Sequence, residues 1–408
     1  MRIVLINQFY PPDIAPTGKY LHDFARTLKA RGHEVVVLCS TSAYSQNTTF
    51  STDENLDGIL IHRVWSTGFG RGLKIGRVID YLSFLASLSL KLLALRPRAD
   101  IVVALTTPPY LGLIAQAITT LNNSMMVHWI MDVYPDVLAA DRMLDEDTPV
   151  YRAMIALTRL QMRAPLTFCL GDHMKHCLSK YFDTAMLSSL QSVPLWAPAH
   201  PSSVETTTGY HEFRKRNGWS ENELVFMYSG NMGSGHRFSE FLSAARSLGD
   251  MGPQWVFIGD GRRRKQIEVF INEEPRAKVS ILPYVKPESL FESLGAADVH
   301  LISQSAEWQG VIVPSKTQCA FFIGRPVIFV GDRNNEVADW IHESGAGWIV
   351  PENDHAALLR ACKEATDPVE RDRRGKAAKA FAQTHFNYFE NSAKMAELLE
   401  TTFQALRR

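Results

Sequence analysis

The chain has 408 residues, which is too many for one ordinary domain and predicts two. Its hydrophobic content of 46% is that of a globular protein with a sizeable core. Lysine plus arginine and aspartate plus glutamate both number 43, so no global positive field predicts a nucleic-acid partner.

The N-terminus and the cysteines indicate the compartment. The start, MRIVLINQFYPP, lacks the basic region, apolar core and cleavage site of a signal peptide. The cysteines are scattered, odd in number and without metal-ligand spacing, which favours reduced thiols. They are Cys39, Cys169, Cys177, Cys319 and Cys362. We therefore expect a cytoplasmic protein.

In the first half, short apolar runs alternate with helical patterns. The expected strands are residues 3–6, 35–38, 59–64, 101–105, 127–131 and 166–170. The clearest amphipathic helix covers 18–31. This alternation predicts a parallel sheet, and ligands bind at the carboxyl ends of such strands.

Three residues of the first half are candidates for an acceptor site. Asp132 ends a strand, where a carboxylate can accept a proton from a hydroxyl group, although a capping role is the alternative. His128 lies four residues earlier and shares the face of Asp132, although we expect a buried, hydrogen-bonded histidine there ahead of a functional one. Gly18 begins a helix and could meet an anion there.

Residues 78–95 form a long apolar segment. Asp80 and Lys91 interrupt it, so we expect no membrane span. Basic and aromatic residues precede it, namely Arg63, Trp65, Phe69, Arg71, Lys74 and Arg77. The segment is either a core helix beside a solvated loop or an interfacial contact with a membrane.

The pattern breaks at residues 193–210, which contain three prolines and resemble a linker. A second half then repeats the α/β plan. Its expected strands are 224–228, 255–258, 279–282, 299–302 and 327–330, with helices at 237–248, 354–365, 370–381 and 387–406. Two such halves predict a ligand site on each and a cleft for the chemistry.

Glycine-rich turns follow two strands of the second half. The first, 229–237, contains Gly230 and Gly233 and ends at Arg237, so its amides and charge suit a pyrophosphate. The second has Gly259 and Gly261 before the basic run Arg262–Lys265. The alternatives are a turn without a ligand and a solvated basic helix face.

The segment 302–331, ISQSAEWQGVIVPSKTQCAFFIGRPVIFVG, is the most informative stretch. Glu307 lies in a polar loop, and Gly310 allows close approach of the backbone. Ser315 is a good N-cap for a short helix at 316–323 that begins with Lys316. This combination predicts an anion site, and the alternative is an ordinary loop–helix–strand unit.

Taken together, these motifs resemble those of family 4 glycosyltransferases of the GT-B type, in the branch that builds bacterial surface polysaccharides and O-antigens. The resemblance is carried in order by RIVLINQFYPPDIAPTGKYLHDFARTLKARGHEVVVL, DVYPD, YSGNMG, FIGDG, GVIVPSK and GRPVIFVG. It implies an α/β GT-B fold of two Rossmann-like β/α/β domains facing a central cleft. The acceptor domain would be 1–195, the donor domain 210–384, and the helix at 385–408 would cross back to the first domain.

The family resemblance also implies the activity. Members are retaining, metal-independent transferases that use nucleotide sugars, here a UDP-sugar ahead of a GDP-sugar, with no cofactor. The apolar, basic stretch suggests a polyprenyl-diphosphate-linked sugar as acceptor, at the inner face of the cell membrane. We expect no nucleic-acid partner.

Site residues carry over by position. Glu307 matches the first Glu of the family's E-x7-E motif, which contacts the donor sugar, while Ser315 stands where the second, ribose-binding Glu is usual. The backbone at Gly310 and Val311, together with Lys316, would face the phosphates. The other carried-over positions are Asn231 and Arg237 at the pyrophosphate, where Asn231 replaces a common Arg, Tyr284 and Val285 at the base, and Asp132 beside the reacting centre.

Two alternatives stay open from the sequence. One is a nucleotide-sugar epimerase of the same architecture, which would turn over without an acceptor. The other is a non-catalytic membrane-associated subunit, which the missing second Glu suggests.

Overall fold

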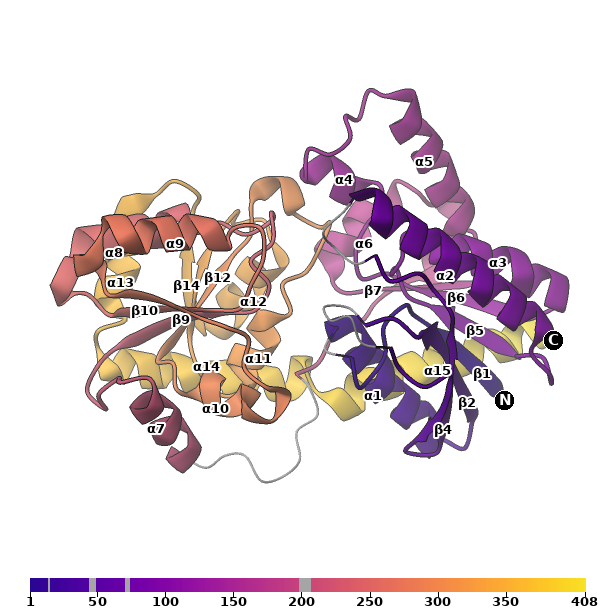
Figure 1. Ribbon diagram of the computed structural model, residues 1–408, viewed down its shortest axis with the longest axis horizontal. Coiled ribbons are helices and arrows are strands. Elements are labelled where there is room, and N and C mark those ends of the chain that lie inside the picture. The colour runs from indigo at the N-terminus through magenta and orange to yellow at the C-terminus, as the bar shows by residue number, and fades with distance from the viewer. Residues whose placement is uncertain (14, 44–48, 70–73, 198–206) are drawn as a thin grey trace. The chain divides into compact units, whose positions relative to one another are not determined.

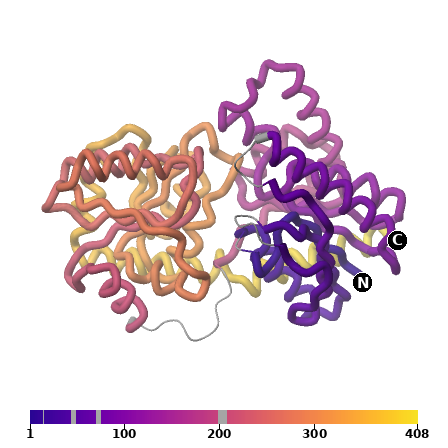
Figure 2. Tube along the Cα trace, viewed as in Figure 1, coloured from indigo at the N-terminus to yellow at the C-terminus, as the bar shows by residue number. Residues whose placement is uncertain are grey.

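The computed structural model describes residues 1–13, 15–43, 49–69, 74–197 and 207–408. The chain forms two compact units, Met1–Pro194 with Tyr388–Arg408, and Leu195–Asn387. Each unit is a mainly parallel sheet with helices on both faces, which confirms the expected α/β class (Figure 1). Figure 2 shows that the yellow C-terminal end lies in the same unit as the indigo N-terminal end.

The first unit has an eight-stranded sheet in the order β3-β4-β2-β1-β5-β6-β7-β8. Its strands are β1 (Arg2–Ile6), β2 (Glu34–Ser40), β3 (Asp53–Leu56), β4 (Ile59–Val64), β5 (Ile101–Ala104), β6 (Met125–Trp129), β7 (Leu166–Cys169) and β8 (Leu190–Ser192). The edge pair of β3 and β4 is antiparallel, whereas the other named strands of this sheet pair in parallel in the described part of the chain. The strand order reverses beside β1, so the loops after β1 and β5 meet at one edge of the sheet.

The helices of the first unit cover both faces of this sheet (Figure 1). They are α1 (Pro16–Ala30), α2 (Lys74–Ala94), α3 (Leu111–Asn122), α4 (Asp136–Ala140), α5 (Pro149–Gln161), α6 (Asp172–Ser179), α15 (Tyr388–Arg407) and the 3-10 turn η1 (Thr184–Ser189). The first helix begins at Pro16 and not at the expected Gly18, because the fixed φ of proline suits a first helical turn. Phe84, Leu88 and Leu92 of α2 lie in the core.

The last helix, α15, packs on α1. The hydroxyl of Thr27 is 2.9 Å from that of Ser392. Glu400 accepts two hydrogen bonds from Arg31, at 2.8 and 2.6 Å, and lies 2.8 Å from His33 Nε2. The hydrogen bonds from Arg31 lower the pKa of Glu400 to about 2. The chain therefore ends in the unit in which it begins.

The second unit has a six-stranded, all-parallel sheet in the order β11-β10-β9-β12-β13-β14. Its strands are β9 (Val225–Ser229), β10 (Gln254–Ile258), β11 (Val279–Leu282), β12 (Val299–Ser303), β13 (Val327–Val330) and β14 (Gly347–Val350). The order reverses between β9 and β12, which is where such sheets bind ligands.

The helices of the second unit connect these strands in sequence. They are α7 (Thr207–Arg216), α8 (Ser239–Leu248), α9 (Arg264–Glu273), α10 (Leu290–Gly295), α11 (Lys316–Phe322), α12 (Glu336–Ser344), α13 (His355–Glu364) and α14 (Pro368–His385), with 3-10 turns η2 (Gly249–Met251), η3 (Pro275–Ala277), η4 (Pro287–Ser289) and η5 (Ala306–Trp308).

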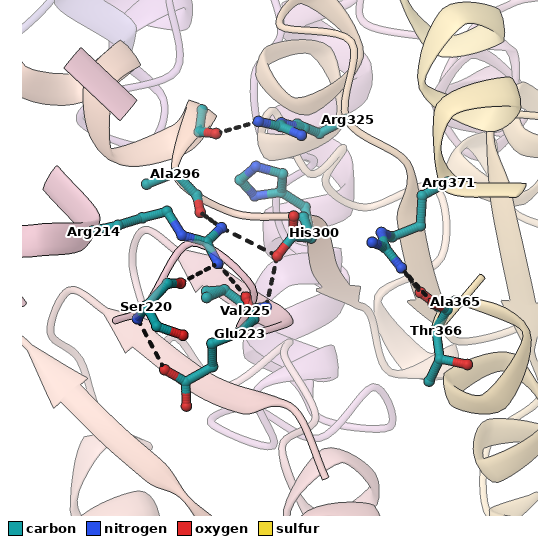
Figure 3. A network of polar contacts seen from close by, with 12 residues as sticks. Arg214, Ser220, Glu223, Val225, Ala296, His300, Arg325, Ala365, Thr366 and Arg371 are labelled. Atoms are coloured by element: carbon teal, nitrogen blue, oxygen red, sulfur yellow. Dashed lines mark hydrogen bonds and ion pairs between the residues drawn. The ribbon is translucent and has the colours of Figure 1, made fainter. Parts of the chain in front are cut away.

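A buried arginine anchors α7 to the strand starts (Figure 3). Arg214 donates to the carbonyl of Ala296 at 3.0 Å and to the carboxylate of Asp298 at 3.2 Å. The same Asp298 oxygen accepts the N–H of Val225 at 2.8 Å. Because removing one partner would leave a buried charge unpaired, this network fixes the starts of β9 and β12 firmly. The site loops lie at the other end of these strands.

Candidate active site

Two loops at the switch point of the second sheet are joined by hydrogen bonds. The N–H of Ser305 donates to the carbonyl of Gly235 at 2.9 Å. The N–H of Arg237 donates to the Ser303 hydroxyl at 2.9 Å, and His236 Nδ1 lies 2.7 Å from the Ser303 carbonyl. These hydrogen bonds therefore hold the loop after β9 against the loop after β12.

Close packing of loops explains two of the predicted glycines. Gly259 and Gly261 have φ values of 132° and 145°, which disfavour other residues. A Cβ on Gly259 would lie 2.1 Å from the carbonyl oxygen of Gly230, and one on Gly261 would lie 2.6 Å from that of Met232. These glycines let the turns after β9 and β10 pack against each other, whatever ligand they meet.

The basic run after Gly261 braces the same turns. Arg263 donates to the carbonyl of Ser234 at 3.0 Å, and Arg264 donates to that of Gly259 at 2.9 Å. The expectation of a solvated basic face is therefore wrong for these two side chains.

Lys316, the first residue of α11, places a positive charge beside these turns. Its ammonium lies 3.1 Å from His236 Nε2 and 4.9 Å from the centre of the Tyr228 ring. A Cβ on Gly230 would lie 2.7 Å from Lys316 Cε, so the lysine chain crosses directly over that glycine. Within the ranges that the structure describes, no carboxylate pairs with Lys316.

Burial sets the protonation of this pair. It lowers the pKa of Lys316 to about 8. Burial, and then the charge of Lys316, lower the pKa of His236 to about 3. The imidazole is therefore neutral at pH 7. We assign the proton to Nδ1, which donates to Ser303, so Nε2 can accept from the ammonium.

Arg237 is engaged by acidic and amide partners. Its Nε donates to Glu240 at 2.7 Å, its Nη1 to Glu352 at 2.9 Å and its Nη2 to the side-chain oxygen of Asn353 at 2.9 Å. All three guanidinium nitrogens thus have partners within the second unit. The sequence alone assigned this side chain to the pyrophosphate.

Glu307 lies exposed in η5, in the loop after β12. Gln304 braces that loop by donating to the carbonyls of Trp308 at 2.7 Å and Ile312 at 3.0 Å. The following Gly310 has a φ of 67°. Glu307 is thus carried on a short, firmly held turn.

The remaining predicted donor positions surround the same strand ends. Ser315 occupies the N-cap of α11, as expected, but makes no side-chain capping bond, and Val311 is buried. Tyr284 is exposed after β11, and its hydroxyl donates to the carbonyl of Asp260 at 3.3 Å, while Val285 is half-buried. Asn231 is exposed, and a Cβ on Gly233 would lie 3.2 Å from its amide nitrogen.

Asp132 lies in a small pocket of the first unit, just after β6. Thr106, Tyr110 and Tyr134 line the pocket with it. Burial raises the pKa of Asp132 to about 6. No hydrogen-bond partner of its carboxylate is found among the described residues, so this group could accept a proton from a bound hydroxyl.

His128 and Gly18 lie in packed surroundings. His128 is fully buried, its Nε2 lies 3.1 Å from the side-chain oxygen of Gln116, and burial lowers its pKa to about 4. A Cβ on Gly18 would lie 2.8 Å from the carbonyl of Phe9, and its own N–H is bonded to Ala15 at 3.1 Å. These positions favour core and loop-packing roles, which sequence analysis had left open.

The apolar segment forms α2, one face of which is exposed. The exposed apolar side chains recur at helical spacing and are Ile75, Val78, Ile79, Leu82, Leu90 and Leu93. The presence of Asp80 in this apolar helix has a local explanation, because its carboxylate accepts hydrogen bonds from Thr67 and Phe69 at 2.7 and 3.0 Å. None of the helices in the described ranges is both long and apolar enough to cross a membrane.

The predicted basic flank of α2 needs correction. Arg63 is buried, donates to Glu54 at 2.6 Å and to the carbonyl of Pro11 at 2.7 Å, and so does not face solvent. Arg71 and the side chain of Lys74 lie outside the described residues. Trp65 and Phe69 are exposed as expected.

A second exposed helix face was missed. The helices α2, α3 and α5 pack in a row, α2 against α3 and α3 against α5. Exposed apolar and basic side chains share α5, namely Val150, Arg152, Leu157, Arg159 and Leu160. Their helical spacing was the signal that could have revealed this face.

Comparison with known proteins identifies the enzyme class. Residues 17–170 match the glycosyl transferase 4-like domain. The chain is a glycosyltransferase, and this part of it resembles that domain. It is 25% identical over 283 residues to a probable glycosyltransferase, WbjE, of Pseudomonas aeruginosa, covering 68% of each chain. It is also 19% identical over 348 residues to a putative colanic acid biosynthesis glycosyl transferase, WcaI, of Escherichia coli K12, covering 83% of this chain and 85% of that one.

Solved structures give the fold of this glycosyltransferase. Sucrose-phosphate synthase of Thermosynechococcus elongatus superposes with a TM-score of 0.77 at 15% identity, covering 99% of this chain and 100% of that one. HepE of Anabaena, solved with UDP and glucose, gives a TM-score of 0.70 at 12% identity, covering 98% and 100%. The expected GT-B architecture is confirmed.

Proposed function

We propose that the chain is a retaining, metal-independent glycosyltransferase that moves a sugar from a nucleotide sugar to a lipid-linked saccharide in polysaccharide biosynthesis. The observation that carries the proposal is Lys316, a half-buried ammonium without a carboxylate partner among the described residues, at the switch point of a parallel sheet. The printed names of WcaI, a colanic acid enzyme, and HepE, seen with UDP and glucose, support the pathway class and a UDP-sugar ahead of a GDP-sugar.

Transfer breaks the bond between the anomeric carbon and the donor phosphate, and the diphosphate leaves with growing negative charge. Fixed positive groups stabilise such a leaving group when they are already in place. Lys316 supplies the charge, and the turns after β9 and β12 supply backbone amides. Glu307 contacts the donor sugar.

Retention follows from attack on the face that the phosphate leaves. The acceptor hydroxyl forms the new bond to the anomeric carbon, and its proton passes to the departing phosphate. Asp132, a carboxylate in a pocket of the first unit, orients that hydroxyl by accepting its hydrogen bond. Its raised pKa keeps it within reach of protonation near neutral pH.

The exposed face of α2 supports a lipid-linked acceptor. Ile75 is 78% exposed and Leu90 is 71% exposed, and they belong to a row of exposed apolar side chains along one helix, a pattern that marks interaction surfaces. Together with the arginines of α5, this face suits shallow burial in an anionic membrane surface. We place the acceptor on a polyprenyl diphosphate at the inner face of the cell membrane.

A donor panel tests the proposal. UDP- and GDP-sugars are incubated with purified protein, with and without polyprenyl-diphosphate sugar, and with and without EDTA, and the products are read by mass spectrometry and NMR. We expect transfer only with acceptor, with retained anomeric configuration and in the presence of EDTA. Epimerised nucleotide sugar without acceptor would favour an epimerase, and absence of donor binding a non-catalytic subunit.

A further inference from the structure

Glu352 connects the turn that carries Glu307 to Arg237. It lies just after β14, and its side chain is only 19% exposed. One carboxylate oxygen accepts the N–H of Ala306, the first residue of η5, at 2.6 Å. The other accepts from Arg237 Nη1 at 2.9 Å. A single carboxylate therefore caps the turn and holds it to the loop after β9.

Arg237 is itself fixed from the opposite side. Glu240, in the first turn of α8, accepts from Arg237 Nε at 2.7 Å, and Ser239 donates to the second oxygen of Glu240 at 2.8 Å. The side chain of Glu240 is only 6% exposed. Two carboxylates thus enclose one guanidinium, and the formal charge of this group is −1.

That charge argues against a phosphate at Arg237. An anion that approached the guanidinium would meet the carboxylates of Glu240 and Glu352 as well, and such like charges repel at short range. Lys316 pairs with no carboxylate in the described part of the chain, so its charge is not offset as that of Arg237 is. Charge-assisted hydrogen bonds of the type around Arg237 are strong and directional, which suits a structural brace.

We propose that Glu352 and Arg237 are positioning residues that hold the Glu307 turn against the loop after β9, and that Arg237 is not a phosphate ligand. This inference rests on the proposed donor site. Loss of these contacts should allow the Glu307 turn to move, and a displacement of about 1 Å can lower a reaction rate about a hundredfold. The phosphate contacts, made by other groups, should remain.

The test compares free nucleotide with nucleotide sugar. Calorimetry would measure the Kd of UDP and of UDP-glucose, or of GDP and GDP-mannose where the donor panel prefers guanosine, for wild type, Glu352→Ala and Arg237→Gln. We expect both variants to weaken nucleotide-sugar binding about tenfold, to leave free nucleotide within about twofold, and to be non-additive when combined.

Glu274→Ala is the matched control, because Glu274 pairs with Arg246 at 2.7 Å in the same unit but away from the strand-end loops. Thermal melting compares the folding of all variants. If Glu352→Ala does not fold, Glu352→Gln serves, since its amide oxygen can still accept from Ala306 while its NH2 opposes Arg237.

The outcomes separate the two proposals. The positioning role of Glu352 and Arg237 is overturned if either variant loses free-nucleotide binding, or if both variants bind nucleotide sugar as tightly as wild type. Either outcome leaves the glycosyltransferase proposal standing. Absence of any nucleotide binding by the wild-type protein overturns the donor site and the inference with it.

Discussion

The ammonium of Lys316 lies 3.1 Å from the neutral Nε2 of His236, whose other ring nitrogen is held 2.7 Å from the Ser303 carbonyl. The histidine accepts from the lysine without cancelling its charge. This arrangement orients a half-buried cation and leaves its charge available to a ligand.

Removing that cation should abolish most of the activity. We expect Lys316→Ala to lower kcat by about a hundredfold or more, since a preorganised charge on the leaving group is lost. Steady-state transfer assays would measure it. Near-normal turnover would remove Lys316 from the site.

The pKa of Lys316, about 8, predicts that the pH profile of activity has an alkaline limb. The ammonium is present below that pH and is lost as pH rises through it, so kcat/KM should fall above about pH 8. Lys316→Arg should flatten this limb, because a guanidinium stays charged. An unchanged limb in that variant would assign it to another group.

Substitution of Asp132 should lower the activity of the protein and raise its stability. Its pKa is raised by burial to about 6, so the folded protein binds a proton more tightly than the unfolded chain, and stability falls as pH rises from about 4 to 6. At pH 7, Asp132→Asn should raise the free energy of unfolding by about 1–3 kcal/mol. It should also lower turnover and remove the acidic limb near pH 6. A destabilised, active variant would contradict both expectations.

Negative charges placed on the exposed face of α2 should weaken the binding of the protein to membranes. Leu82→Glu with Leu90→Glu should reduce co-sedimentation with anionic liposomes at least several-fold, because two apolar contacts become repulsive. Met251→Glu is the control, since Met251 is 94% exposed, more than Leu82 or Leu90, but belongs to the second unit. Wild-type protein that stays entirely in the supernatant would rule out the membrane contact.

Gly259 should tolerate no side chain. Gly259→Ala combines an unfavourable φ with a contact of 2.1 Å to backbone and should destabilise the second unit by about 3 kcal/mol or more. Gly345→Ala shares a positive φ but meets nothing within 4 Å, so about 1 kcal/mol is expected. Equal melting temperatures for the two variants would argue against the loop packing.

Sequence periodicity predicted the alternation of strands and helices because burial follows a fixed spacing in each. It also predicted that Lys316 begins a short helix after the loop that contains Gly310. It could not predict that Arg63 is buried, since its partners Glu54 and Pro11 come together only when the edge strands pair. Glu352 was missed for the same reason, because it lies in a turn without a motif and its role comes from Arg237 and Ala306, far away in the chain.

The docking of α15 on α1 has a consequence for synthesis. The first unit needs Tyr388–Arg408, so the ribosome must finish the whole second unit before α1 receives the partners Ser392 and Glu400. Until α15 leaves the ribosome, a face of α1 stays uncovered, whereas Leu195–Asn387 is already synthesised. In the order of synthesis, the second unit is thus an insertion whose residues are all made before the first unit is complete.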